Sequence, residues 1–156
     1  MSGEIEARLE KLGLTLPPAP SPVANYVPHL IAGDLLFISG QVSKAADGSL
    51  VRGLLGADVA LETGQHAARL CALNVLAQAK AALGSLDRIG QVLQLTGFVA
   101  STPEFGEQPQ VVNGASDLMV EVLGSAGRHT RSAVGVASLP LNAAVEIDAI
   151  IKIKDR

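Results

Sequence analysis

The segment HTRSAVGVASLPLNAAVEIDAI, from His129 to Ile150, decides the fold of this chain. Small and branched apolar residues dominate it, which predicts two sheet strands on either side of a turn at residues 139–142. Arg131 opens the first predicted strand, Glu146 stands near the middle of the second, and Asp148 follows. Long charged side chains are unusual in strands that otherwise suit a core, so Arg131 and Glu146 are candidates for a functional site.

The second predicted strand has two faces, both of them partly apolar. Side chains alternate along a strand, so one face carries Val145, Ile147, Ala149, Ile151 and Ile153, and the other carries Glu146, Asp148, Ile150 and Lys152. A partly apolar second face predicts that it too is covered, most economically by a neighbouring subunit.

A simple hairpin about Pro140 would pair Arg131 with a residue near Ile151. Arg131 and Glu146 would then lie about 16 Å apart and on opposite faces of the sheet. They share a site only if different subunits contribute them, or if a bulge or a longer turn changes the register. The sequence leaves these alternatives open.

The rest of the chain predicts an α+β domain. Residues 26–41 are typical of a β-hairpin with its turn at Gly33-Asp34, and residues 42–60 are mostly loop. Helical periodicity covers 61–83 and 109–123, each followed by a glycine, and 92–99 is typical of a strand. The order ββαβαββ predicts a two-layer sandwich, with a mixed sheet and two helices on one face.

Composition and the N-terminal region complete the expectations. The 156 residues are 48% hydrophobic with a formal charge of −3, which suits one domain and disfavours nucleic-acid binding. Residues 1–20 are interpreted as a helix and a proline-rich linker, separate from a domain at 21–156. Cys71 is interpreted as a small core residue, in keeping with a reducing cytoplasm. No signal peptide or apolar run of roughly 20 residues is seen, so we expect no membrane association.

The motifs resemble those of the Rid family, the reactive intermediate deaminases, also called YjgF-like. Its C-terminal signature is an Arg opening a strand, then Leu-Pro, then a Glu fifteen positions after the Arg; its N-terminal signature is a Tyr-led strand, a Gly at the turn and a Ser-Gly-Gln end. The matching residues here are Arg131, Leu139-Pro140, Glu146, Tyr26, Gly33 and Ser39-Gly40-Gln41, and Asn113 falls near the family's helical Asn.

This resemblance implies a chorismate-mutase-like homotrimer with active sites in clefts between subunits. It implies hydrolysis of reactive enamines and imines, such as 2-aminoacrylate, to 2-keto acids and ammonia, without cofactor or metal. Arg131 suits a bidentate grip on the substrate carboxylate, and Glu146 suits holding a water and acting as acid–base. By resemblance, Tyr26 would wall the pocket, Gly40 would bring its backbone close to the ligand, and Asn113 would contribute a hydrogen bond.

Other interpretations remain. Many Rid proteins carry a Cys two residues after the Arg, where this chain has Ala133, which keeps open a non-catalytic trimer that binds a small carboxylate metabolite through Arg131. A ribonuclease is disfavoured by the acidic balance and the scarcity of aromatic residues. Arg131 could instead be a strand-end ion-pair partner. His29, His66 and His129 show no metal-ligand spacing. His129, two residues before Arg131, is a candidate for tuning the pocket.

Overall fold

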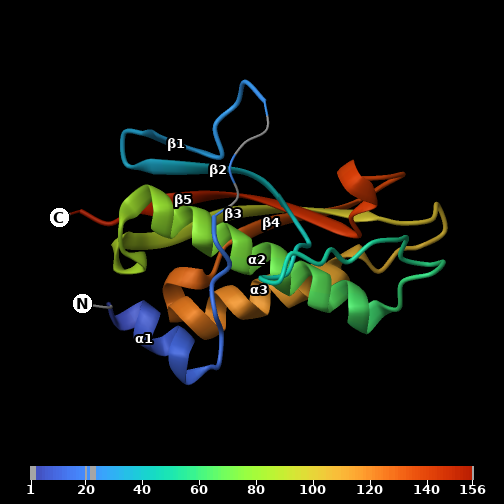
Figure 1. The fold of residues 1–156 in the computed structure, drawn as a ribbon, viewed down its shortest axis with the longest axis horizontal. Helices are drawn as coiled ribbons and strands as arrows, with labels where there is room; N and C mark the ends of the chain where they lie inside the picture. The colour runs from blue at the N-terminus through green and yellow to red at the C-terminus, as the bar shows by residue number, and fades with distance from the viewer. Residues whose placement is uncertain (1–2, 20, 22–23, 156) are drawn as a thin grey trace.

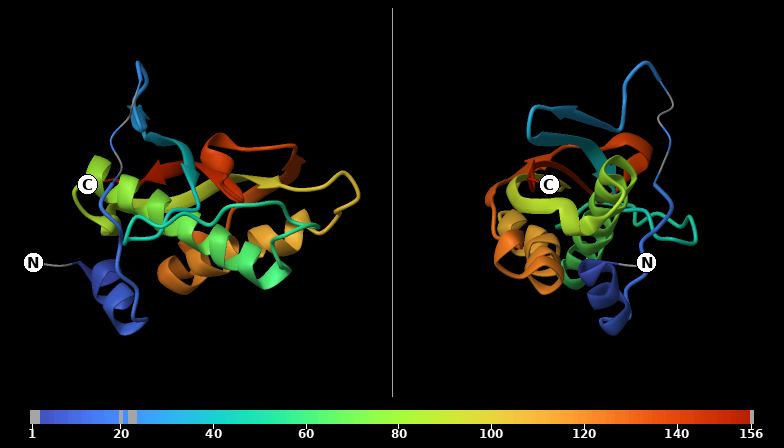
Figure 2. Two further views of the ribbon diagram at one scale, coloured as in Figure 1. Left: turned by 45° about the vertical axis from the view of Figure 1, so that its right-hand side comes forward. Right: turned by 90° about the vertical axis from the view of Figure 1, so that its left-hand side faces the viewer.

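The computed structural model describes residues 3–19, 21 and 24–155. It confirms the α+β class and the predicted order ββαβαββ, preceded by a short helix. The elements are α1 (Glu4–Lys11), β1 (His29–Ala32), β2 (Leu35–Val42), α2 (Leu61–Leu83), β3 (Ile89–Ala100), α3 (Gln108–Leu123), β4 (Thr130–Val136) and β5 (Val145–Ile153), with 3₁₀ turns η1 (Leu86–Arg88), η2 (Gly124–Gly127) and η3 (Pro140–Asn142). Helices α2 and α3 lie on the same face of the sheet (Figures 1 and 2).

The five strands are ordered β1-β2-β5-β3-β4, and only β3 and β4 are parallel. The hairpin considered for the last two strands is therefore wrong, because β3 lies between β4 and β5. Since β3, α3 and β4 form a βαβ unit, β4 occupies one edge of β3. The other edge of β3 is left for β5, which pairs antiparallel with β3 and with β2.

The core lies between the sheet and the two long helices. The β5 side chains predicted to share one face, from Val145 to Ile153 at every second position, are all buried there. Cys71 of α2 is fully buried, and its thiol lies 3.4 Å from the carbonyl of Val145, as expected for a core residue. Burial, and secondarily the charge of Glu146, raises the pKa of this thiol well above its usual value.

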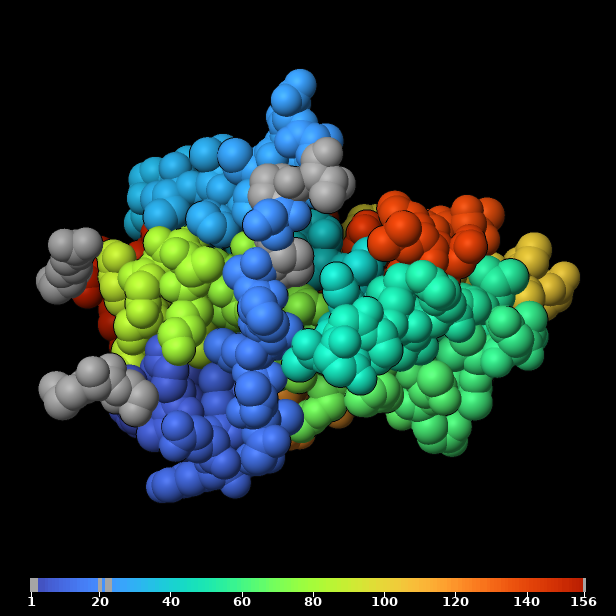
Figure 3. All heavy atoms as spheres, in the orientation of Figure 1, coloured from blue at the N-terminus to red at the C-terminus, as the bar shows by residue number. Residues whose placement is uncertain are grey.

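Helix α1 packs against α3 and η1. Its first two N–H groups, of Glu4 and Ile5, donate to the carboxylate of Asp87 at 2.9 Å, and Leu9 is buried in the core. The described part of the following segment lies on the surface over α2 (blue in Figure 3), with two of its leucines packed against the core. Pro20 of the predicted linker lies outside the described residues.

The face of the sheet opposite the helices, the open face, is covered by no helix of the described residues. It carries both apolar and polar side chains, as the alternation in β5 predicted. Phe37 is 38% exposed and Val134 is 43% exposed, and the half-buried Asp148 and Ile150 lie on the same face. This face is available for a partner.

Candidate functional site

A cavity of about 430 Å³ lies beside the second half of β2, and we call it the β2-edge cavity. Strand β1 pairs only with Leu35–Ile38, so the edge of β2 beyond Ile38 is not covered by a strand. The cavity is lined by Tyr26, Pro28, Ser39, Gly40, Gln41, Asn74, Gln78, Pro140, Leu141 and Glu146, among others. Three of the predicted site residues, Tyr26, Gly40 and Glu146, are thus brought together here.

Tyr26 was predicted to lead a strand, but it lies in a bend before β1. The N–H and the hydroxyl of Ser39 both donate to the carbonyl of Pro28, at 3.0 and 3.1 Å. These bonds tie the segment that carries Tyr26 to the edge of β2. The segment therefore forms a wall of the cavity although it is not part of the sheet.

Gly40 of β2 and Glu146 of β5 are in close contact near one end of the pairing between the two strands. A Cβ atom placed on Gly40 would lie 2.8 Å from Cδ and 2.9 Å from Oε2 of Glu146. The register of β2 shifts between Ile38 and Gln41, as in a β-bulge, which sets this approach. Only a residue without a side chain leaves the Glu146 carboxylate in its present place.

The half-buried Glu146 has a perturbed acidity. Burial raises the pKa of its carboxyl above the usual value, and the nearby charge of Asp148 raises it further. Burial also raises the pKa of Asp148, although hydrogen bonds from Thr96 offset part of this effect. A carboxyl group whose pKa is raised toward neutrality is better suited to exchange protons with a substrate.

Arg131 lies elsewhere, against helix α3. Its NH1 group donates to Oδ1 of Asn113 at 2.8 Å and to Oγ of Ser116 at 3.1 Å. Asn113 was predicted as a site residue, and Ser116 was not. The spacing of Asn113 and Ser116, three residues apart on a helix, could have indicated that they share a face. We call Arg131, Asn113, Ser116 and His129 the Arg131 cluster.

Arg131 is not the ion-pair partner that one interpretation of the sequence suggested. Among the described residues, no carboxylate lies within ion-pair distance of its guanidinium, and the ion pairs found there join other residues. The guanidinium charge is therefore met only by neutral oxygen atoms. Such a cation at a protein surface is available to an anion.

Within one chain, Arg131 and Glu146 do not form one site. Arg131 pairs with Leu95 of β3, and Glu146 pairs with Phe98 of the same strand. Three residues along β3 and two inter-strand spacings separate their Cα atoms by about 14 Å. Because Leu95 and Phe98 face opposite sides of the sheet, so do Arg131 and Glu146. The β2-edge cavity and the Arg131 cluster are therefore two separate regions of the chain.

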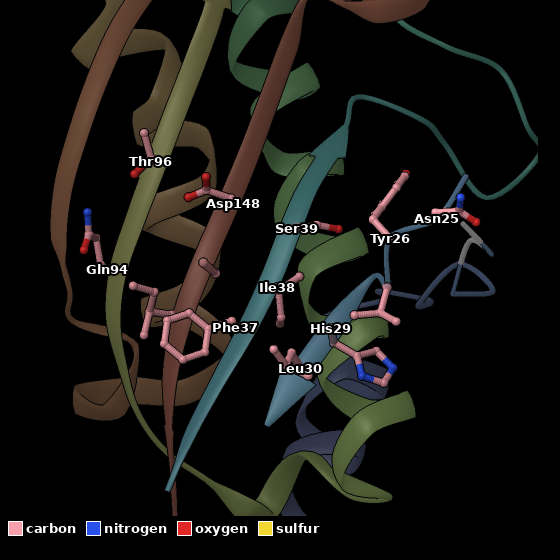
Figure 4. Close-up of a pocket in the computed structure, with 13 residues that line it drawn as sticks. Asn25, Tyr26, His29, Leu30, Phe37, Ile38, Ser39, Gln94, Thr96 and Asp148 are labelled. Carbon is pink, nitrogen blue, oxygen red and sulfur yellow. The ribbon is translucent and has the colours of Figure 1, made fainter. Parts of the chain in front are cut away.

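A second hollow, of about 620 Å³, lies on the open face (Figure 4) and shares lining residues with the β2-edge cavity. Tyr26 and Ser39 line both. Polar groups from β3 and β5, including Thr96 and Asp148, line its far side. The two hollows together run from the sheet edge across the open face.

Two buried polar side chains of α2, which sequence reasoning missed, line the β2-edge cavity. Asn74 is 3% exposed and Gln78 is 1% exposed. The amide of Asn74 donates to the carbonyls of Val42 and Lys44 at 3.2 and 2.9 Å, so it holds the end of β2 against the helix. Their spacing of four residues within the otherwise apolar stretch 70–79 was the available signal.

In the described part of the chain, no helix is both long and apolar enough to cross a membrane. Within the same residues, no group of three or more His, Cys, Asp or Glu side chains is arranged to hold a metal ion.

Comparison with known proteins gives a consistent set of relatives. Residues 6–151 match the family described as "YjgF/chorismate_mutase-like, putative endoribonuclease". The chain is 49% identical to Protein TCP17 of Trypanosoma cruzi over 155 residues, 99% of this chain and 97% of that protein. The crystal structure of Atu1372, of unknown function, from Agrobacterium tumefaciens is 56% identical, with a TM-score of 0.89 over 96% of this chain and 94% of that one. The crystal structure of E. coli TdcF with bound serine is 30% identical, with a TM-score of 0.62 over 86% and 92%.

Proposed function

Because the chain belongs to the YjgF/Rid family, we propose that it is a deaminase that hydrolyses small 2-imino acids, such as 2-aminoacrylate in its imine form, to 2-keto acids and ammonia. The proposal is carried by two separate regions, the Arg131 cluster and the β2-edge cavity, which we propose are the two half-sites of one active site. One offers a cation that no carboxylate of the described residues neutralises, and the other offers a half-buried carboxyl group with a raised pKa. A 2-imino acid needs both, one for its carboxylate and one for the water that attacks it.

The complete site is proposed to form between subunits of a homotrimer. The Arg131 cluster of one subunit would face the β2-edge cavity of the next, which would bring together groups that one chain holds about 14 Å apart on opposite sheet faces. The exposed apolar side chains of the open face, such as Phe37 and Val134, support a neighbouring subunit there.

In the proposed reaction, Arg131 binds the substrate carboxylate and Glu146 holds a water against the imine carbon. As the water oxygen bonds to that carbon, Glu146 accepts a proton from the water and passes it to the nitrogen. In the resulting carbinolamine, Glu146 accepts the hydroxyl proton and donates it to the nitrogen, the C–N bond breaks to release ammonia, and the carbonyl of the 2-keto acid forms. Tyr26 walls the pocket, Gly40 keeps its backbone close to the ligand, and Asn113 orients Arg131.

No cofactor or metal is needed in this reaction, because the imine is already electrophilic. The bound serine in the TdcF crystal structure is a small amino acid with a carboxylate, which is the ligand chemistry proposed here. The single free, buried cysteine fits a reducing compartment, and we propose the cytoplasm.

The test is a coupled assay in which a pyridoxal-phosphate enzyme generates 2-aminoacrylate and the release of pyruvate and ammonia is followed. The wild-type protein should accelerate this release, and an Arg131→Lys variant of unchanged melting temperature should not. Equal rates with and without the wild-type protein would reject the proposed activity.

A second candidate is a non-catalytic trimer that binds a small carboxylate metabolite through Arg131. Ala133 favours it, because many Rid proteins have a cysteine at this position and this chain has no thiol there. Binding of pyruvate to the wild-type protein without any imine hydrolysis would support it over the deaminase. The family description also includes endoribonucleases, so an assay of RNA cleavage belongs beside the other two.

A further inference from the structure

The Arg131 guanidinium is held by an ordered chain of hydrogen bonds. Its NH1 nitrogen carries two hydrogens, and two acceptors meet them, Oδ1 of Asn113 at 2.8 Å and Oγ of Ser116 at 3.1 Å. NH1 is therefore fully used within the chain. A guanidinium has five N–H donors, and the remaining three, on Nε and NH2, have no hydrogen bond among the described residues.

His129 fixes the role of Ser116. Nδ1 of His129 lies 2.6 Å from the carbonyl oxygen of Gly127, and a carbonyl oxygen can only accept, so Nδ1 carries a hydrogen. In the neutral ring, Nε2 is then an acceptor. It lies 2.8 Å from Oγ of Ser116, so the Ser116 hydroxyl donates to it. The lone pairs of Oγ are thereby turned toward Arg131.

We propose that Ser116 and His129 are positioning residues that hold Arg131 with NH1 turned into the protein, so that only its Nε–NH2 edge is presented to a carboxylate. This inference rests on the proposed function, because it concerns how the same Arg131 receives its ligand. Two parallel hydrogen bonds from Nε and NH2 match the two oxygens of a carboxylate. The ligand class is thus a carboxylate that approaches the guanidinium from the side.

The contacts that hold Arg131 have an energetic consequence for ligand binding. Arg131 is on the edge strand β4 and is half-buried, and a free arginine side chain loses substantial rotamer entropy when it binds a ligand. The contacts of NH1 with Asn113 and Ser116 restrict the side chain before the ligand arrives. Preorganisation of this kind increases affinity by lowering the cost of ordering on binding.

The test compares Ser116→Ala, which removes the acceptor, with Ser116→Thr, which keeps a hydroxyl. Ser125→Ala is the matched control, because Ser125 is exposed in η2 beside the cluster and its hydroxyl has no hydrogen bond among the described residues. Two quantities are measured for each variant, the Kd of pyruvate by calorimetry and the kcat and KM of imine hydrolysis. Melting temperatures check that each variant folds.

Ser116→Ala should weaken pyruvate binding about tenfold, since loss of one hydrogen bond to a charged group has an effect of this order. It should raise KM by a similar factor and change kcat by less than about threefold, because the lost contact acts on binding rather than on the reacting bond. Ser116→Thr should restore most of the affinity, and Ser125→Ala should match the wild type. His129→Phe should also weaken binding, and the double variant with Ser116→Ala should be no worse than Ser116→Ala alone, because His129 acts through Ser116.

Unchanged pyruvate affinity and KM in a folded Ser116→Ala variant would overturn the inference. The proposed function would still stand if the wild-type protein hydrolyses the imine. Additive losses in the double variant would also overturn it, because they would mean that His129 does not act through Ser116. If the wild type binds pyruvate and Ser116→Ala weakens that binding, but no imine is hydrolysed, the inference holds and the deaminase proposal fails.

Discussion

Gly40→Ala tests the contact between β2 and Glu146 most sharply, because it adds one methyl group at a known distance. The added Cβ would lie 2.8 Å from Cδ of Glu146, and ordinary van der Waals contact begins at 3.4 Å, so the carboxyl group must move by about 0.6 Å. The backbone itself tolerates alanine, because Gly40 is not among the glycines with positive φ. The change therefore acts mainly on the position of the proposed acid–base group.

A misplacement of about 1 Å at a reacting group can reduce a rate on the order of a hundredfold. We expect Gly40→Ala to lower the kcat of imine hydrolysis roughly tenfold to a hundredfold, with a smaller change in the Kd of pyruvate, since the carboxylate grip lies in the other half-site. The assay is the coupled release of pyruvate, with calorimetry for binding. Gly106→Ala is the matched control, because Gly106 has no positive φ and its added Cβ would meet nothing within 4 Å. A kcat for Gly40→Ala equal to that of Gly106→Ala would refute this account of Glu146.

Three further predictions follow from the same contacts. Arg131→Lys keeps the charge but loses the planar fork, so affinity for pyruvate should fall on the order of a hundredfold by calorimetry, in a protein that melts normally; equal affinities would contradict this role. Glu146→Gln should spare pyruvate binding and remove the fall of kcat at acid pH. Asp148→Asn should move that fall to lower pH, because it removes a charge that raises the pKa of Glu146. A pH profile of kcat that Asp148→Asn leaves unmoved would exclude Glu146 as the titrating group. Asp87→Ala should lower the free energy of unfolding by about 1 kcal/mol at pH 7. The difference from wild type should vanish in acid. The α1 amides hold the pKa of Asp87 below its usual value, so this stabilisation is lost as pH falls through the pKa of the folded state.

Local chemistry in the sequence was enough to predict most of the elements. Gly33 adopts φ of 62° between β1 and β2, and Gly84 and Gly124 end the two long helices, where only glycine takes positive φ at little cost. The strand order was not accessible from the same signals. Which strand lies beside β5 depends on contacts between segments far apart in the sequence, and the βαβ unit of β3, α3 and β4 overrode the pairing that the short turn suggested.

The candidate site, like the fold, was only partly predictable from the sequence. Glu146 and Arg131 were proposed as site residues because a charge in an apolar strand is conspicuous. Their placement on opposite faces follows from their register with β3. Ser116 was missed because a serine on a helix has no distinctive pattern until the fold brings Arg131 to it. Asn74 and Gln78 share one face of α2, but their spacing alone does not show that this face lines a cavity, so they were missed.

The central claim is that imine hydrolysis needs Arg131 of one subunit and Glu146 of the next, and subunit mixing tests it most directly. Arg131→Lys and Glu146→Gln chains are combined in equal amounts, by co-expression or by refolding together, and the kcat of imine hydrolysis is compared with that of each parent. In randomly mixed trimers, about a quarter of the sites would contain both native residues, so about a quarter of the wild-type activity should return. A mixture no more active than the mean of its two parents would contradict the account.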